Sequence, residues 1–474
     1  MEEPTATMSI DKSSMDKTPT GNSSTGTGAP PPASDPSRVA QWLIPGWKRG
    51  LKTISMLGAA TALGAVLVFL TQTLLARELG PQAYGLFASS LATVTMIAPL
   101  AGFGLGQFRL RVYGVEGWAA SRWVKPSLRF SVGTTLLALS IIVFWAIFVA
   151  PDEGTRFALF VLMPVVLSVL AIELMSNQTR LEDRYAKMAS WQLAIPGSRF
   201  IAAVMLLLIP NLTERFVAVS YGVISLCIVA LAVPQLRNML RGEIDLRGHG
   251  PKRDIPGPVV VPRVSDVWAQ SWAYGMYAVL YPVFFQVSTI LLKYLGSNTQ
   301  AGRWAIALAV MSAIYLIPAT IYQKFLMGKL LRWAHHDPHK FWLVYKRGNV
   351  GMTLLGLAVS VSMVAVTPIV VPFVFGEKYR AVVGILFVLS LCPPIRFLST
   401  SMGSALLTDE HNRYRVYAMA WATLVAVALN ALLIPRFAEL GAAWATVIAE
   451  LVLLAGTWHG VRHFHRARRE KGHQ

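Results

Sequence analysis

Long apolar runs alternate with short polar connections along most of the chain, and twelve such runs can be distinguished. Each approaches the ~20 residues that a helix needs to cross the hydrocarbon core of a bilayer. All are predicted to be helices, because an open sheet facing lipid would leave backbone groups unpaired. The pattern therefore predicts an all-α integral membrane protein with about twelve transmembrane helices. The predicted segments are 53–75, 84–108, 127–150, 157–177, 190–209, 216–234, 267–292, 304–326, 349–374, 381–407, 414–435 and 440–461.

Two of these connections resemble each other. The stretch 75–108 joins two apolar runs through a tight Gly-Pro turn, which predicts a helical hairpin. A weaker copy of this stretch occupies 291–325. The matching positions are Gly80 with Gly296 and Gly85 with Gly302. An internal repeat of this size indicates two related six-helix half-bundles that face a shared central cleft.

Composition and charge agree with a membrane protein and orient it. The chain is 54% hydrophobic and only 14% charged, whereas soluble domains carry about a quarter charged residues. Of its 43 Lys and Arg residues, 33 fall on the side that holds both termini if all twelve segments cross. Positive residues concentrate on the cytoplasmic side, so both termini are predicted to be cytoplasmic. The net charge of +19 is assigned to this asymmetry and not to nucleic-acid binding, since no compact basic module is present.

The same pattern divides the chain into five parts. The ends lack apolar runs, and the longest internal connection is basic and rich in proline, which is typical of a linker. The predicted parts are a disordered cytosolic tail at 1–45, an N-terminal six-helix bundle at 46–234, a cytosolic linker at 235–266, a C-terminal six-helix bundle at 267–462 and a basic cytosolic tail at 463–474.

Polar side chains inside membrane helices are costly and therefore mark functional candidates. Cationic and amide groups could bind an anionic headgroup, because a guanidinium presents several donors to a phosphate. The substrate-binding candidates for the cavity are Gln72, Arg77, Arg199, Gln286, Lys293, Lys324 and Arg396. Gln72 and Gln286 occupy comparable places in the two repeats. The candidates for ion coupling are Glu173 and Glu450.

Each candidate also has a simpler interpretation. Lys293 and Lys324 could extend to the nearest membrane interface. Arg199 and Arg396 could form internal ion pairs, with Glu173 and Glu450 as the available partners. The small residues of the first helix, Ala60 and Gly64, are more typical of a packing seam than of a ligand site.

Catalytic residues, metal sites and cofactors are not predicted. The outer loops are short and contain no spaced pair of carboxylates, so an enzyme that transfers sugars has little room there. No Gly-rich loop ends in Lys-Ser or Lys-Thr, which speaks against direct use of ATP. The two cysteines, Cys227 and Cys392, both lie inside apolar runs and support neither a disulfide framework nor a metal site.

Three motifs, in order, resemble a known family. They are Ala76-Arg77-Glu78-Leu79-Gly80-Pro81-Gln82-Ala83-Tyr84-Gly85-Leu86-Phe87, then Phe375-Gly376-Glu377-Lys378-Tyr379, then Asn430-Ala431-Leu432-Leu433-Ile434-Pro435. This set resembles the polysaccharide transporter family, the Wzx-like oligosaccharide flippases of the multidrug/oligosaccharidyl-lipid/polysaccharide exporter superfamily. Two positions depart from the pattern: Ser288 replaces an acidic residue of many relatives, and Arg303-Trp304 follows the second turn.

The resemblance implies two six-helix bundles around a central cavity lined mainly by helices one, two, seven and eight. It implies a multi-pass protein of the bacterial inner membrane that flips a polyprenyl-diphosphate-linked oligosaccharide by alternating access. The pathway would be exopolysaccharide, O-antigen lipopolysaccharide or capsule synthesis. Membrane lipids, a polysaccharide polymerase and a chain-length regulator are the partners it suggests. The alternatives are a peptidoglycan-precursor flippase or multidrug exporter of the same superfamily, a membrane polymerase or ligase, and a scaffold.

Overall fold

The computed structural model describes residues 36–208, 211, 213–241, 246, 261–321, 338–404 and 412–471. The chain divides into two compact units, Met1–Leu51 and Lys52–Gln474. In the first unit the described part is the helical start of α1 from Pro36. The second unit is built from helices, and no strand occurs among its described residues. The fold is therefore all-α, as the apolar pattern predicts.

The first half of the second unit contains the following elements. They are α1 (Pro36–Ile97, from Lys52 onward), α2 (Pro99–Gly102), α3 (Leu105–Glu116), the 3-10 helix η1 (Gly117–Trp123), α4 (Val124–Phe144), the π-helix η2 (Trp145–Val149), α5 (Glu153–Leu162), α6 (Pro164–Leu181), α7 (Tyr185–Leu206) and α8 (Glu214–Leu240). The second half contains α9 (Val264–Leu295), α10 (Asn298–Ala319), α12 (Pro338–Phe375), the 3-10 helix η4 (Glu377–Tyr379), α13 (Val382–Leu389), α14 (Cys392–Gly403) and α15 (Asn412–Lys471).

Within the described residues, seven continuous helical stretches are long and apolar enough to cross a membrane, or eight if the bent pair α13 and α14 is one span. Two of them, Ser55–Val149 and Arg413–His463, are far longer than the ~20 residues of one crossing. Non-helical backbone interrupts α1 at Gly80 and α15 at Ala438. These breaks divide the long helices into pairs, while the predicted number of twelve crossings stays a prediction.

The break in α15 is a hairpin. A side chain at Gly456 would collide with Ala418, and the Tyr414 ring lies 5.4 Å from the His463 ring. Both pairs are centred near Ala438, where the backbone adopts φ 50°. The arms therefore run antiparallel, and they correspond to the predicted segments 414–435 and 440–461.

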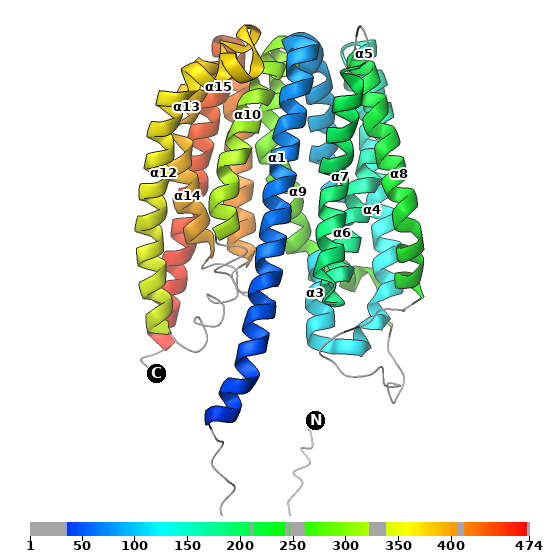
Figure 1. Ribbon diagram of the computed structural model, residues 1–474, viewed down its shortest axis with the longest axis vertical. Coiled ribbons are helices and arrows are strands. Elements are labelled where there is room, and N and C mark those ends of the chain that lie inside the picture. The colour runs from blue at the N-terminus through cyan, green and yellow to red at the C-terminus, as the bar shows by residue number, and fades with distance from the viewer. Residues whose placement is uncertain are drawn as a thin grey trace, which may run out of the picture. The chain divides into compact units, whose positions relative to one another are not determined.

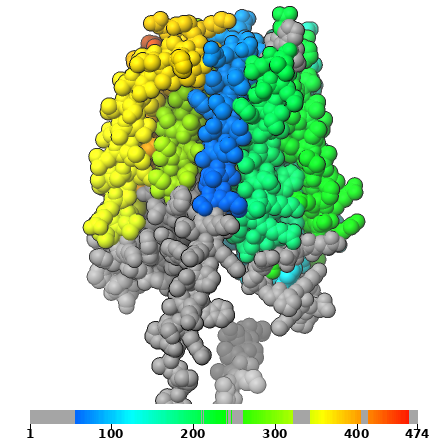
Figure 2. All heavy atoms as spheres, viewed as in Figure 1, coloured from blue at the N-terminus to red at the C-terminus, as the bar shows by residue number. Residues whose placement is uncertain are grey.

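The helices sort into two packing groups. In one group α2 to α8 pack on each other, and in the other α9 to α15 do so. Of these, α9 also contacts α2, α3 and α4 and so joins the groups. Figure 1 shows the first arm of α1 between the two groups, and Figure 2 shows its blue surface between the yellow-green surface of α10 and the green surface of α7. The exact boundaries of the predicted bundles stay a prediction.

The two repeated hairpins meet at one end of the molecule, called here the outer end, where the breaks at Gly80 and Gly296 lie. A side chain added at Gly85 would lie 2.8 Å from the backbone nitrogen of Gly302, and one at Gly302 would lie 3.0 Å from that of Gly85. The two glycines thus allow backbone-to-backbone contact between α1 and α10. The opposite end, where α3 ends and α9 begins, is called the inner end; the charge pattern predicts it to be cytoplasmic.

A hydrogen bond adds to this closure at the outer end. The hydroxyl of the buried Tyr379 in η4 donates to the carbonyl oxygen of Ala76 over 3.1 Å. Burial raises the pKa of the Tyr379 phenol, and Arg303 lowers it in part. The phenol therefore keeps its proton at neutral pH and remains a donor.

Candidate functional site

A cavity of about 720 Å³ lies between the helices of the second unit. Its walls come from both arms of α1 and from α7, α8, α9 and α10. This volume is within the range of small-molecule binding sites, roughly 300–1,000 Å³. The lining positions on the first arm of α1 run from Ala60 to Leu75, which is about 22 Å of helix at ~1.5 Å per residue.

Small residues make room for this cavity. On α10 the lining alanines Ala305, Ala309 and Ala313 recur every four residues and so share one helix face. Ala60 and Gly64 of α1 also line the cavity. Gly64 faces α7 as well, because a side chain added there would touch Leu193 and Pro196. The predicted packing seam of the first helix is thus part of the cavity wall.

Amide side chains from three helices line the cavity. Gln72 of α1 and Gln286 of α9, the pair singled out by the repeat, both line it. Gln192 of α7 does so too, although sequence reasoning missed it. The spacing could have identified it, because Gln192 lies seven residues before Arg199 and therefore on the same helix face. The Oε1 atom of Gln72 is buried without a hydrogen-bond partner.

Arg199 is the one charged side chain among the described residues that line the cavity. Its guanidinium carbon lies 4.3 Å from the ring centroid of Tyr221, a buried residue of α8 that also lines the cavity. The Nε atom is buried and has no hydrogen-bond partner. No ion pair is recorded between Arg199 and a described carboxylate, so its charge is held against an aromatic face with one donor unused.

The remaining cationic candidates do not line this cavity. Arg77 is exposed near the end of the first arm of α1. Lys293 is buried at the outer end, where its ammonium donates to the hydroxyl of Thr155. That hydroxyl in turn donates to Asp152 over 2.7 Å, so Lys293 joins α9 to the start of α5. Lys324 lies outside the described residues.

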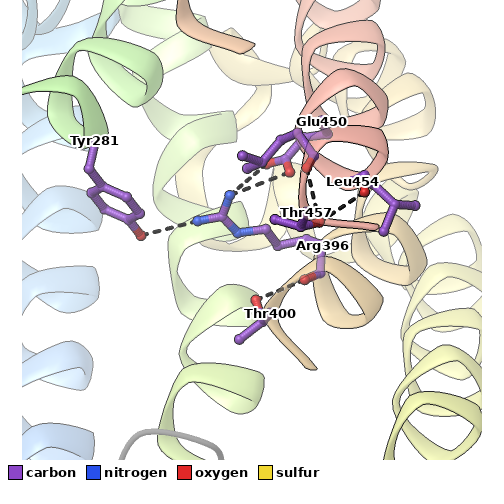
Figure 3. A network of polar contacts seen from close by, with 7 residues as sticks. Tyr281, Arg396, Thr400, Glu450, Leu454 and Thr457 are labelled. Atoms are coloured by element: carbon purple, nitrogen blue, oxygen red, sulfur yellow. Dashed lines mark hydrogen bonds and ion pairs between the residues drawn. The ribbon is translucent and has the colours of Figure 1, made fainter. Parts of the chain in front are cut away.

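Arg396 sits in a separate polar network inside the second helix group (Figure 3). Its Nη1 atom lies 3.4 Å from a carboxylate oxygen of the fully buried Glu450, and its Nη2 donates to the Tyr281 hydroxyl over 3.3 Å. The rings of Tyr281, Phe285 and Tyr315 surround the guanidinium, with centroids 5.6, 4.9 and 5.4 Å away. Of the two interpretations open from sequence, the geometry is that of an internal ion pair.

Glu173 lies at the break between α2 and α3 and not beside an arginine. Its carboxylate lies against Gly106, in the first turn of α3. Gly102 and Gly106 leave room for the Glu173 carboxylate, because a side chain at either position would meet it, in the latter case at 2.6 Å. At the glycine-rich end of the first hairpin, α6 therefore packs against the break between α2 and α3.

The described residues contain no group of three or more His, Cys, Asp or Glu side chains that could hold a metal ion. The cavity itself is lined by hydroxyl, amide, aromatic and small apolar groups together with Arg199. Such a lining can form hydrogen bonds with a neutral polar ligand and attract one anionic group.

Comparison with known proteins places this fold in a class. The chain is similar to a solved structure titled as an inward-facing multidrug resistance MATE family transporter of the MOP superfamily, with 13% identity, a TM-score of 0.63 and coverage of 85% of this chain and 96% of that one. It is also similar to a structure titled as the lipid II flippase MurJ in an inward closed conformation, with 13% identity, a TM-score of 0.61 and coverage of 86% and 87%. The chain therefore shares the helical fold of these two multi-pass membrane proteins.

The sequence itself defines the family. The family described as "Polysaccharide biosynthesis protein" matches residues 51–326, more than half of the chain, and the chain belongs to it. No curated protein matches the sequence. The match covers both repeated hairpins, which confirms the family resemblance of the sequence motifs.

Proposed function

We propose that this protein is a flippase that moves a polyprenyl-diphosphate-linked oligosaccharide across the cytoplasmic membrane for exopolysaccharide, O-antigen or capsule synthesis. The family description and the superfamily fold support transport of a lipid-linked sugar. The amides of Gln72, Gln192 and Gln286 supply paired donors and acceptors that suit sugar hydroxyls.

The observation that carries this proposal is the Arg199 guanidinium in the cavity wall. A permanently charged group with an unused donor and no ion pair with a described carboxylate is suited to a phosphate oxygen. The stacking on Tyr221 fixes the position of the guanidinium plane without neutralising it. We therefore assign the diphosphate of the substrate to Arg199 and the sugar to the amide side chains.

The cavity favours transport over sugar transfer. Its described lining contains no carboxylate and no histidine, so it offers no obvious general acid or base. A membrane polymerase or ligase would need such a group beside the glycosidic bond.

The test uses membrane vesicles that contain the protein and a labelled lipid-linked repeat unit. Arg199→Gln removes the charge, and a lost hydrogen bond to a charged group costs roughly 1.5–3 kcal/mol. We expect translocation to fall about tenfold to a hundredfold, with partial recovery in Arg199→Lys. The matched control is Arg215→Gln on α8, because Arg215 is exposed and does not line the cavity.

Unchanged translocation in Arg199→Gln would remove the assignment of the diphosphate. A wild-type protein that moves no lipid-linked repeat unit would refute the flippase proposal itself. The fold shared with a multidrug transporter and a lipid II flippase leaves two further outcomes. Deletion that changes toxin tolerance would indicate a drug exporter, and deletion that prevents growth would indicate a flippase for the peptidoglycan precursor.

A further inference from the structure

The break between α2 and α3 is held in an unusual backbone conformation. Phe103 has φ 38° and ψ 50°, and Gly104 follows with φ 73°. A bulky residue with positive φ is strained and persists only where its surroundings hold it in place. Two sets of contacts do so here, one from α9 and one from α6.

The contact with α9 joins the two helix groups. The Phe103 ring stacks on Trp268 with centroids 4.9 Å apart and planes inclined by 8°. Gly275 lets the ring approach, because a side chain there would lie 2.6 Å from Phe103 Cγ, and a side chain at Gly104 would collide with the Tyr274–Gly275 backbone. We call the contact of Phe103 and Gly104 with Trp268 and Gly275 the inner latch.

The inner latch lies beyond the cavity on its inner side. The last cavity-lining residue of α1 is Thr95, eight positions before Phe103, or about 12 Å along a helix at ~1.5 Å per residue. Because α2 and α3 belong to one packing group and α9 to the other, separating the groups at this end requires the inner latch to open.

The contact with α6 consists of one ionisable group. The Glu173 carboxylate lies beside Gly106 at the positive end of α3, since a side chain added at Gly106 would lie 2.6 Å from its Oε1 atom. Asn177, one turn further along α6, lies beside the same glycine. A negative charge here is favourable only while it faces the free N–H groups of the helix start, since burial opposes the charged form.

No ion pair joins Glu173 to a Lys or Arg side chain among the described residues. The elements packed on α6 are α2, α3, α4, α5, α7 and α8. Of these, α2 has no charged residue. The charged residues of the others are Arg109, Arg111 and Glu116 on α3, Lys125 and Arg129 on α4, Glu153 and Arg156 on α5, Lys187 and Arg199 on α7, and Glu214, Arg215 and Arg237 on α8.

We propose that Glu173 is a proton-binding site that controls the inner latch. The ionised carboxylate anchors the start of α3 and thereby holds Phe103 against Trp268. Binding of one proton removes the charge that faces the positive end of α3 and so removes its attraction to the free N–H groups there. The strained hinge at Phe103 then relaxes, and the two helix groups separate at the inner end. This inference goes beyond the proposed function and holds for any transported substrate.

The test measures a distance across the inner latch in the full chain without substrate. Spin labels are placed at Val115→Cys on α3 and Val261→Cys before α9, both exposed at the inner end, with Cys227 and Cys392 replaced by alanine. Distances are recorded from about pH 8 to about pH 5, a range over which buried carboxyls can titrate. We expect one short distance at high pH and a second, longer one that grows as the pH falls.

Variants separate Glu173 from general effects of acid. Glu173→Gln, which cannot ionise, should show the longer distance at every pH, and Glu173→Asp should shift the pH midpoint. The matched control is Glu182→Gln at the end of the same helix, where the buried carboxylate accepts from Gln178 over 2.9 Å. This control should respond to pH as the parent does.

The proposal is overturned if Glu173→Gln keeps both the short distance and the pH response of the parent. If Glu173→Gln does not fold, Trp268→Ala provides the second measurement. It removes the aromatic face of the inner latch and should give the longer distance independently of pH. A persistent short distance in that variant would equally contradict the proposal. Failure of sugar transport with a pH-dependent distance intact would instead count against the proposed function alone.

Discussion

Two arginines inside helices show how much surroundings decide the role of a residue. Arg199 lies over one aromatic ring in a cavity wall and keeps an unused donor. Arg396 is neutralised by Glu450 and enclosed by three rings. The residues next to each arginine in the sequence do not show whether its role is binding or structural, because the partners of Arg396 come from α9, α10 and α15. Only a distance across the fold distinguishes a binding group from a structural one.

The buried pair predicts a specific pattern of stability. Removing one partner leaves an unpaired buried charge and costs roughly 3–5 kcal/mol, whereas replacing both by apolar residues can be neutral. We therefore expect Arg396→Met and Glu450→Leu each to lower the melting temperature of the detergent-solubilised protein strongly. The double variant Arg396→Met/Glu450→Leu should melt near the parent.

Additive losses in that double variant would contradict the assignment of a coupled pair. The matched comparison is Arg380→Met, because Arg380 pairs with Glu377 at an exposed site with an N–O distance of 3.5 Å. Exposed pairs contribute about 0–1 kcal/mol. Its melting temperature should therefore stay close to that of the parent.

At the scale of elements, the hairpin repeat was the most informative signal in the sequence. The matched glycines Gly85 and Gly302 contact each other, and the matched glutamines Gln72 and Gln286 line one cavity. These positions could be predicted because the turn and its flanking residues recur at fixed spacing. Glu173 could not be placed in the same way, because its neighbours in α3 lie far from it in the sequence.

The element α7 shows why crossings are hard to count, although the apolar pattern predicts one at 190–209. It is not among the helices that pass as membrane spans by length and apolarity. Its polar residues Gln192 and Arg199 line the cavity, and Pro196 lies between them. A helix that carries part of a binding site loses some of the apolar pattern by which spans are recognised.

The glycine contact predicts a marked size dependence. Gly85→Ala would place a methyl group against the backbone of Asn298 and Gly302, and overpacking of this kind costs roughly 1–3 kcal/mol. Gly85→Val should therefore lower the melting temperature more than Gly85→Ala. Gly133→Ala in α4 is the control, since nothing lies within 4 Å of a side chain there, and it should be neutral or stabilising by about 0.5–1 kcal/mol.

A melting temperature that is unaffected by Gly85→Val would mean that α1 and α10 do not approach as described. The same pair tests the repeat, because Gly302→Ala should behave like Gly85→Ala. Its methyl group would meet the Gly85 backbone from the other side.

For the whole molecule, the contacts between the helix groups differ at the two ends. The outer end combines the glycine contact with polar links: Tyr379 to Ala76, Lys293 to Thr155, and Trp145 to Tyr294 over 2.7 Å. At the inner end the Phe103 ring stacks on Trp268, and a buried apolar cluster that includes Phe130 and Val267 also joins the two groups. The outer end is therefore held by polar links and the glycine contact, and the inner end by aromatic and apolar packing.

Weakening the outer end should expose the cavity from outside. Tyr379→Phe removes one buried hydrogen bond worth roughly 1 kcal/mol, which corresponds to about a fivefold change in an opening equilibrium. We expect a cysteine at Gln72, in a chain without other cysteines, to react about fivefold faster with a membrane-impermeant thiol reagent added to intact cells.

A cysteine at Val115 is the control for that experiment. Val115 is exposed at the inner end, which the charge pattern predicts to be cytoplasmic, so it should not react from outside. Equal reaction rates at Gln72 with and without Tyr379→Phe would show that this hydrogen bond does not restrain opening. Reaction at Val115 would reverse the predicted orientation.

The contact between Gly85 and Gly302 has a mechanical consequence. Side chains that interdigitate lock two helices in register, whereas two bare backbones present smooth surfaces. Because neither glycine has a side chain that interlocks with the other helix, we expect the two hairpins to turn on each other at this contact more easily than interdigitated helices would. The outer end would then act as the pivot about which the two helix groups tilt. A small rotation at the glycines would give a large displacement at the far ends of α3 and α9.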